Sequence, residues 1–189
     1  MATRRTPSHQ KKAKKEQGVV LYQDEAVFQQ AGTVIRTWAL VGIGVKVLSP
    51  PVRKSVKVMG AVRIGVNPQW HSRFVEVFNA ETFIEFLNQL LRYYHGTKIH
   101  LITDNAQYHK SPKIREWLKG KEDLIEFHFL PAYSPKFNAV EYLWRKTKRA
   151  ITHNKFFPRL DDLKEALAQR FNRFQGNPAS VRSAIPYFA

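Results

Sequence analysis

The chain has 189 residues, of which 43% are apolar, and this is enough to form one hydrophobic core of ordinary size. It carries 31 Lys and Arg against 15 Asp and Glu, and the resulting net charge of +16 favours a polyanionic partner, usually nucleic acid. The absence of cysteine excludes disulfides and thiolate chemistry, no apolar run approaches the roughly 20 residues of a membrane span, and no apolar signal-peptide core follows Met1.

The first 18 residues differ in composition from the rest of the chain. They contain six Lys or Arg, one Glu and almost no apolar side chain. We expect residues 1–18 to be a flexible basic arm, with a DNA-contacting arm or the end of an interdomain linker as the alternatives. Residues 19–189 contain the aromatic and β-branched side chains of a packed domain, and we expect them to fold as one unit.

The first half of this domain is rich in short Val and Ile segments separated by Gly and Pro, which are typical of antiparallel strands. The expected strands cover about residues 19–23, 33–42, 45–51, 54–65 and 72–78. A helix follows, with Asn79 as its N-cap, apolar residues at helical spacing and Gly96 as its stop.

The second half alternates strands and helices. We expect strands at residues 98–104 and 124–131 and helices at 111–120, 138–151 and 160–174. Ser111 is the expected cap and Pro112 the first residue of the helix at 111–120. Because this alternation favours parallel pairing with helices on both faces, the sequence predicts an α/β fold with a mixed sheet.

Three acids stand at the ends of these elements. Asp24 ends the first strand, Asp104 ends the strand at 98–104, and Glu141 lies near the start of the helix at 138–151. If the two strands are parallel neighbours, the three carboxylates converge at one sheet edge. Carboxylates held this close repel one another unless a cation lies between them, and Mg²⁺ is the usual hard cation beside phosphates.

Each acid also has an ordinary explanation when it is taken alone. Asp24 could be a turn residue, Asp104 could cap a turn together with Asn105, and Glu141 could be a solvated helix acid. Glu25 should point to the opposite face of the strand from Asp24, so we do not expect it in the site. The remaining nearby acids are expected to be solvated, namely Glu122, Asp123 and Glu126.

The wording around the three acids decides between these explanations. The stretches YQDEAVF, LITDNAQYHKS and LPAYSPKFNAVEYLWRKTKR together closely resemble the DDE transposase domain of the insertion-sequence 630 family, within the Tc1/mariner superfamily. The three acids of the family motifs correspond here to Asp24, Asp104 and Glu141. Thirty-six residues separate Asp104 from Glu141, close to the spacing in the family. The resemblance extends from about Lys11 to the C-terminus.

This resemblance implies a ribonuclease H-like fold, a mixed five-stranded sheet flanked by helices. It implies two Mg²⁺ or Mn²⁺ ions, with Asp24 bridging both, Asp104 on one and Glu141 on the other. The implied reaction is hydrolysis of DNA at element ends, followed by attack of the freed 3′-hydroxyl on target DNA, typically at a TA dinucleotide. Asn105 and His109 match the motif and would steady the site or contact phosphate, although His109 could also be an ordinary core or surface histidine.

The helix that carries Glu141 has two distinct faces. Val140, Leu143, Trp144 and Ile151 form an apolar stripe that should pack on the sheet, and Asn138 is expected to cap the helix. A basic face is expected to contact the DNA backbone, with a solvated cationic face as the alternative; it consists of Arg145, Lys146, Lys148 and Arg149. Weaker candidates for DNA contact are Arg53, Lys54 and Lys57, with Trp70 or Tyr133 stacking on a base.

Two features depart from the family pattern. Ala139 replaces the usual proline, which should do little damage because alanine is a good helix former. The sequence also shows no helix-turn-helix unit, so we expect a split-frame product, an excised domain or a remnant. Its expected partners are DNA, a second copy in a homodimer and a separate helix-turn-helix chain, in a prokaryotic cytoplasm at the nucleoid. A nuclease that does not join strands and an inactive DNA-binding remnant are the rival functions.

Overall fold

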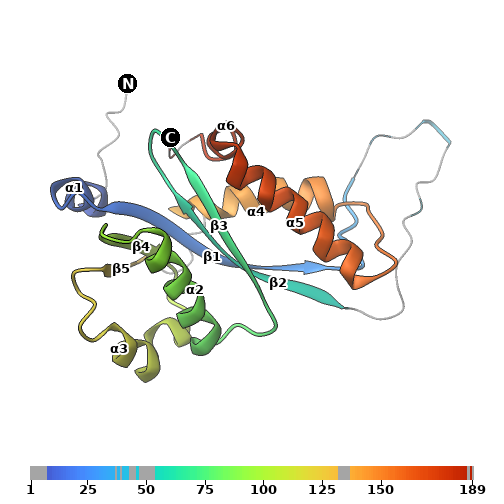
Figure 1. The fold of residues 1–189 in the computed structure, drawn as a ribbon. Coiled ribbons are helices and arrows are strands. Elements are labelled where there is room, and N and C mark those ends of the chain that lie inside the picture. The colour runs from blue at the N-terminus through green and yellow to red at the C-terminus, as the bar shows by residue number, and fades with distance from the viewer. Residues whose placement is uncertain are drawn as a thin grey trace.

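The computed structural model describes residues 8–36, 38, 40–42, 46, 54–131, 137–186 and 188, which form one mixed sheet with helices on both faces (Figure 1). The strands are β1 (Val19–Gln29), β2 (Ser55–Arg63), β3 (Gln69–Val75), β4 (Ile99–Thr103) and β5 (Ile125–Phe129). Their order is β3-β2-β1-β4-β5; β1, β2 and β3 pair antiparallel, while β4 is parallel to both β1 and β5. The predicted mixed five-stranded sheet is confirmed.

The helices cover the two faces of this sheet unequally. In chain order they are α1 (Ser8–Lys15), α2 (Ala80–Tyr93), the 3-10 turn η1 (Gln107–Lys110), α3 (Pro112–Leu118), α4 (Ala139–Ile151), α5 (Leu160–Gly176) and α6 (Pro178–Arg182). Figure 1 shows α4, α5 and α6 on one face and α2 and α3 on the other. None of the helices in the described ranges is both long and apolar enough to cross a membrane.

Local capping explains where these helices begin. Asn79, Ser111 and Asn138 each accept a hydrogen bond from a backbone amide in the first turn of α2, α3 and α4, as their positions predicted. Gly96 follows α2 with a φ of +76°, a left-handed conformation that glycine adopts without strain. The starts of these three helices therefore follow from the sequence.

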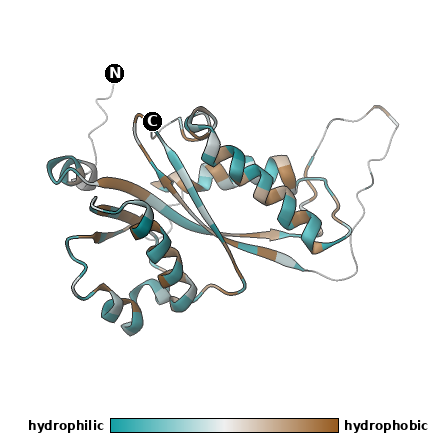
Figure 2. Ribbon diagram, viewed as in Figure 1, coloured by the Kyte–Doolittle hydropathy of each residue, from teal (hydrophilic) through white to brown (hydrophobic). Residues whose placement is uncertain are grey.

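Each face of the sheet has its own apolar core. Phe83, Phe86 and Leu90 of α2 are fully buried on one face. On the other face Trp144 of α4 meets Trp70 of β3 edge to face, with ring centroids 5.0 Å apart, and the rings of α5 pack beside them. Figure 2 shows hydrophobic and hydrophilic residues alternating along the helices, as expected for helices with one buried side. Trp70 is 1% exposed, so its predicted stacking on a base is wrong.

The early part of the chain differs from the prediction. Residues 33–36, 38 and 40–42 form no strand beyond an isolated bridge between Thr33 and His153, so the predicted strand at 33–42 is wrong in its described part. The strand predicted at 45–51 lies outside the described residues except for Lys46. β1 is longer than expected, because its last residues pair with β2 alone.

The predicted flexible arm is wrong for residues 8–15, which form α1. Ala13 is 2% exposed and joins the core on the α4 side, and the Lys12 ammonium hydrogen-bonds both carboxylate oxygens of Glu126 on β5, at 2.6 and 2.7 Å. Composition indicated an arm because nearly every residue here is polar. The Lys12–Glu126 contact joins residues 114 positions apart, and composition cannot indicate such a partner.

Candidate active site

Asp24 lies on β1 and Asp104 directly follows the neighbouring strand β4, close to where the parallel pairing of the two strands ends. The last pair in the register is Tyr22 with Ile102, and each aspartate lies two residues further on. The predicted position of Asp24 at the end of a strand is wrong. Asp24 lies in the middle of β1, which continues to Gln29. Asp24 lies opposite Gly60 of β2. At this point β1 no longer pairs with β4 but still pairs with β2.

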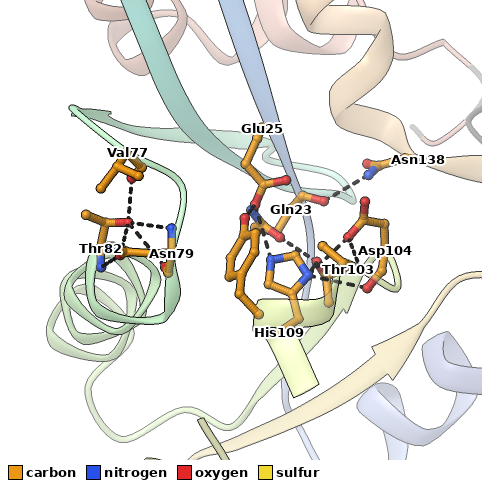
Figure 3. A network of polar contacts seen from close by, with 11 residues as sticks. Gln23, Glu25, Val77, Asn79, Thr82, Thr103, Asp104, His109 and Asn138 are labelled. Carbon is orange, nitrogen blue, oxygen red and sulfur yellow. Dashed lines mark hydrogen bonds and ion pairs between the residues drawn. The ribbon is translucent and has the colours of Figure 1, made fainter. Parts of the chain in front are cut away.

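Glu141 reaches this edge because α4 is fastened to β1. The Asn138 amide donates a hydrogen bond of 2.8 Å to the backbone carbonyl of Gln23, directly before Asp24. Its side-chain oxygen accepts from the Val140 amide at 3.1 Å, which caps α4. Asn138 is 3% exposed, so both bonds are shielded from water. The same side chain thus begins the helix of Glu141 and joins it to the strand of Asp24 (Figure 3).

Glycine at position 60 allows α4 to lie close to the sheet. A Cβ atom added there would lie 2.6 Å from the Trp144 ring, a distance that real contacts do not reach, and it would also overlap the Trp70 ring. Trp144 is one turn beyond Glu141 in α4. The missing side chain of Gly60 therefore sets the distance between α4 and the strand that carries Asp24.

The electrostatics of Asp24 reflect the convergence of the three acids. Burial, followed by the negative charges of Glu141, Glu25 and Asp104, raises the pKa of Asp24 to about 8. The metal-free site therefore holds a proton on Asp24 at neutral pH. A divalent cation would replace that proton.

Asp104 is held by a buried histidine. His109 Nδ1 lies 3.1 Å from Asp104 Oδ1, and the Ala106 amide donates to the same oxygen at 2.9 Å (Figure 3). The hydrogen bond from His109 lowers the pKa of Asp104, so this carboxyl is ionised at neutral pH. Both contacts are made to Oδ1, and Oδ2 remains available to a ligand.

The other nitrogen of His109 faces Glu25, the acid that the sequence pattern led us to set aside. Glu25 does lie on the opposite face of β1 from Asp24, but its Oε1 is 3.2 Å from His109 Nε2. The Tyr108 hydroxyl and the Gln23 amide also donate to Oε1, the latter at 2.8 Å. Burial opposes a charge on His109, but hydrogen bonds to Asp104 and Glu25 outweigh it and raise the pKa of His109 to about 9.

Glu25 is thus a site residue that sequence reasoning missed. Strand alternation correctly gave the face on which its side chain lies. It could not show that η1 folds back onto that face, with Tyr108 and His109 directed at the same carboxylate. The available signal was the pair of polar residues, Tyr108 and His109, shortly after Asp104 in a segment that contains no strand.

Asn105 has a bridging position beside Asp104. Its side-chain amide donates to the backbone carbonyl of Leu130, which follows β5, and its oxygen accepts from the Lys110 ammonium. It therefore connects the segments that follow β4 and β5. Tyr133 lies outside the described residues, so the structure carries no test of its predicted stacking.

The donor set suits a hard divalent cation. Asp24, Asp104 and Glu141 offer oxygen atoms only, which Mg²⁺ and Mn²⁺ prefer. Asp104 also belongs to a group with Glu25 and His109 in which one ligand atom from each residue lies within 4.8 Å of the others. Burial and the neighbouring carboxylates both disfavour a negative charge on Asp24, and a bound cation would offset both effects.

The basic face of α4 is partly exposed, as expected for a contact surface. Arg145, Lys146 and Arg149 are exposed, whereas Lys148 is half-buried with its ammonium 6.0 Å from the centre of the Phe28 ring. On the opposite side Val140, Leu143 and Trp144 are buried, which confirms the predicted apolar stripe, and Ile151 packs against it. Lys54 and Lys57 belong to the β2 region, while Arg53 lies outside the described residues.

Comparison with known proteins identifies the family. A family model described as DDE superfamily endonuclease matches residues 19–164, which is most of the chain. The chain belongs to this family. It is also 30% identical over 140 residues to the protein named "Insertion element IS630 uncharacterized 39 kDa protein" of Shigella sonnei, covering 71% of this chain and 39% of that protein. The chain therefore spans about two fifths of the length of this DDE relative.

A second relative and several solved structures are also similar to the chain. The "Uncharacterized protein y4pE/y4sA" of Sinorhizobium fredii is 30% identical over 88 residues, covering 47% of this chain and 62% of that protein. The crystal structure of the catalytic domain of Mos1 mariner transposase superposes with a TM-score of 0.59 at 16% identity, covering 94% of this chain and 81% of that one. A pre-cleavage Mos1 transpososome gives 0.60 at 17% identity, covering 94% and 58%. The DDE domain described here thus has the expected ribonuclease H-like fold.

Proposed function

We propose that this chain is the catalytic domain of an insertion-sequence transposase, which cuts DNA at element ends and joins the freed 3′-hydroxyl to target DNA. The observation that carries the proposal is the placement of Asp24 and Asp104 where the parallel pairing of β1 and β4 ends, with Glu141 on the helix that Asn138 joins to β1. Membership of the DDE superfamily endonuclease family supports the same conclusion.

The proposed cofactors are two Mg²⁺ or Mn²⁺ ions held by the three acids. Solved neighbours include Mos1 paired-end complexes with Mn and with Mg, which supports a divalent cation. When bound, such ions stabilise the charge that develops on the attacking and leaving oxygens of an in-line phosphoryl displacement. The residues that would hold these ions are Asp24, Asp104 and Glu141.

The remaining residues position these ligands and the DNA. His109 contacts Oδ1 of Asp104 and leaves Oδ2 for a cation, while Asn138 joins the helix of Glu141 to the strand of Asp24. Asn105 ties the loop after Asp104 to Leu130. The cations on α4 would contact the phosphate backbone on either side of the scissile bond. The proposed target is a TA dinucleotide. The proposed partners are a second copy, in a homodimer that brings two element ends together, and a separate helix-turn-helix chain.

Cleavage and strand transfer on a labelled duplex of an element end, with Mg²⁺ or Mn²⁺ against EDTA, test this function. We expect Glu141→Gln to reduce metal-dependent cleavage by about a thousandfold or more, since a lost charged ligand removes several kcal/mol of transition-state stabilisation. Glu122→Gln is the matched control, because it makes the same change at an exposed acid. Equal rates for the wild type and Glu141→Gln would contradict the assignment of Glu141.

The products of this assay separate the rival functions. Joined products from a donor with a free 3′-hydroxyl indicate a transposase, and cleavage without joining indicates a ribonuclease H-like nuclease. DNA binding without either activity, including after addition of the helix-turn-helix partner, would indicate an inactive remnant.

A further inference from the structure

A second cluster of ligand-type side chains lies on the sheet away from the three acids. His100 of β4 pairs in register with Glu126 of β5, and Ile102 pairs with His128. Because side chains alternate along a strand, Glu126 and His128 lie on one face of β5, the face that His100 shares on β4. The topology therefore brings two imidazoles and a carboxylate together from adjacent parallel strands.

The distances in this cluster suit a metal ion. His100 Nδ1 lies 3.1 Å from His128 Nε2, and His128 Nε2 lies 3.8 Å from Glu126 Oε1. One ligand atom from each residue lies within 4.8 Å of the other two. Two imidazole nitrogens at ordinary Zn–N bond lengths in a tetrahedral site are about 3.4 Å apart. The histidines are already close to this spacing, and Glu126 would move by a fraction of an ångström.

The outer nitrogen of His100 has the environment of a metal-bound histidine. His100 is fully buried, and the nearest oxygen to its Nε2 is Glu16 Oε2 at 3.3 Å. Within the described residues no group accepts a well-directed hydrogen bond from this buried nitrogen. A carboxylate 3.3 Å from Nε2 favours the tautomer that carries its hydrogen there, in which Nδ1 turns a lone pair toward His128.

The Glu126 carboxylate of the cluster is already paired with cations. Two ammonium groups face the cluster: the Lys12 ammonium bonds both oxygens of Glu126, and the Lys98 ammonium lies 3.6 Å from Glu126 Oε2. A metal ion must displace Lys12 from Glu126, which limits the affinity.

We propose that His100, His128 and Glu126 form a binding site for a borderline divalent ion of the Zn²⁺ class, separate from the three-acid centre. Two imidazoles and one carboxylate select Zn²⁺, Co²⁺ or Ni²⁺, whereas the three carboxylates of the other centre select Mg²⁺ or Mn²⁺. Ion binding joins edge strand β5 to β4 through side chains and exchanges the Lys12–Glu126 ion pair for a metal–carboxylate bond. The ion thereby changes how α1 is held on the sheet.

The test is titration of the untagged full chain with Zn²⁺ against a chromophoric chelator, in excess Mg²⁺ to occupy the oxygen-only centre. We expect one Zn²⁺ per chain. Glu16→Gln removes the charge behind a metal ligand and should weaken Zn²⁺ binding by roughly 10- to 100-fold. His128→Ala removes a ligand itself and should weaken Zn²⁺ binding by more than this. His95→Ala removes an exposed histidine outside the cluster and should leave the affinity unchanged.

The absorption spectrum of bound Co²⁺ provides a second readout, because its visible bands depend on the ligand atoms. Thermal melting in Mg²⁺ alone establishes that each variant is folded, and His128→Asn replaces His128→Ala if the latter does not fold. Absence of stoichiometric Zn²⁺ binding in the wild type would overturn the proposal. Equal affinities for His95→Ala and the folded His128 variant would also overturn it, since the ion would then bind elsewhere.

Discussion

At the scale of single residues, the site is defined by how unequal the environments of its acids are. Burial and acidic neighbours raise the pKa of Asp24, whereas the hydrogen bond from His109 lowers the pKa of Asp104. His109 carries a positive charge between Asp104 and Glu25. The metal-free site therefore keeps one acid protonated and one ionised, and this division can be measured.

Asp24→Asn is expected to stabilise the metal-free protein at alkaline pH. The pKa of Asp24 is about 8 in the folded chain and near 3.8 when unfolded, so the folded state binds the extra proton and the wild type loses stability as pH rises between those values. The variant escapes this loss, and its free energy of unfolding should exceed that of the wild type by on the order of 2 kcal/mol at about pH 8. Urea unfolding across the pH range measures this difference.

Two controls belong to this measurement. Asp123→Asn changes an exposed acid and should follow the wild-type curve. Adding Mg²⁺ should reduce the advantage of Asp24→Asn, since the ion stabilises the ionised carboxylate of the wild type. Parallel stability curves for the wild type and Asp24→Asn over the whole range would show that the pKa of Asp24 is not raised.

Glu25→Gln is expected to weaken the contact between His109 and Asp104. The substitution keeps the size of the side chain but removes the charge that faces His109 Nε2, so the pKa of His109 should fall from about 9. We expect the cleavage rate to decrease by about 10- to 100-fold with DNA affinity unchanged, as for other groups that orient a metal ligand. NMR titration of the His109 ring distinguishes this positioning role from a structural one; Glu76→Gln, at an exposed acid, is the control. An unchanged His109 pKa would refute the role.

At the scale of elements, the site depends on how closely α4 lies on the sheet. Two features decide this: the bond from Asn138 to the Gln23 carbonyl, and the absence of a side chain at Gly60 under the Trp144 ring. Both act on α4 rather than on the acids themselves. A change at Gly60 should therefore affect activity beyond its effect on stability.

Gly60→Ala is expected to reduce stability by about 1–3 kcal/mol, because the new methyl group overlaps two buried tryptophan rings. Since α4 must move outward, metal-dependent cleavage should fall further than the loss of folded protein explains. Gly176→Ala is the matched control, since a Cβ atom there meets nothing within 4 Å. Adding Trp144→Phe should restore part of both losses; cleavage that stays at the wild-type rate in Gly60→Ala would contradict the spacing role.

At the scale of the whole molecule, the net charge of +16 and the exposed cations of α4 favour binding to the DNA backbone without base recognition. The catalytic domain alone should bind DNA weakly, with strong salt dependence and little sequence preference. Tight, salt-resistant binding to one sequence by this chain would contradict that expectation.

Arg145→Ala combined with Arg149→Ala is expected to weaken DNA binding uniformly across sequences. The slope of log K against log salt should fall by about 1 to 2, since each lost phosphate contact removes roughly one released counterion. Lys113→Ala combined with Lys119→Ala makes the same charge change in α3 and at its C-cap, across the sheet, and should alter the slope less. Equal slopes for the two double variants would show that α4 is not the contact surface.

The sequence by itself determined the elements whose signals are local. Side-chain caps at Asn79, Ser111 and Asn138 gave the starts of three helices, and apolar spacing gave the buried stripe of α4. The motif around each acid also carried Asp24, Asp104 and Glu141 as a set, because a motif preserves spacing and chemistry along the chain. None of these inferences needed to know which residues meet in space.

Tertiary structure decided everything that depends on residues far apart in the chain. Two examples are the bond from α1 to Glu126 and the contact of η1 with Glu25, and a third is the burial of Trp70. In each case the residues next to these positions in the sequence do not indicate the contact. The length of β1 was also misjudged, since its second half is held by β2 alone. Local patterns fix which face a side chain takes, but only the packing of distant segments fixes what that face meets.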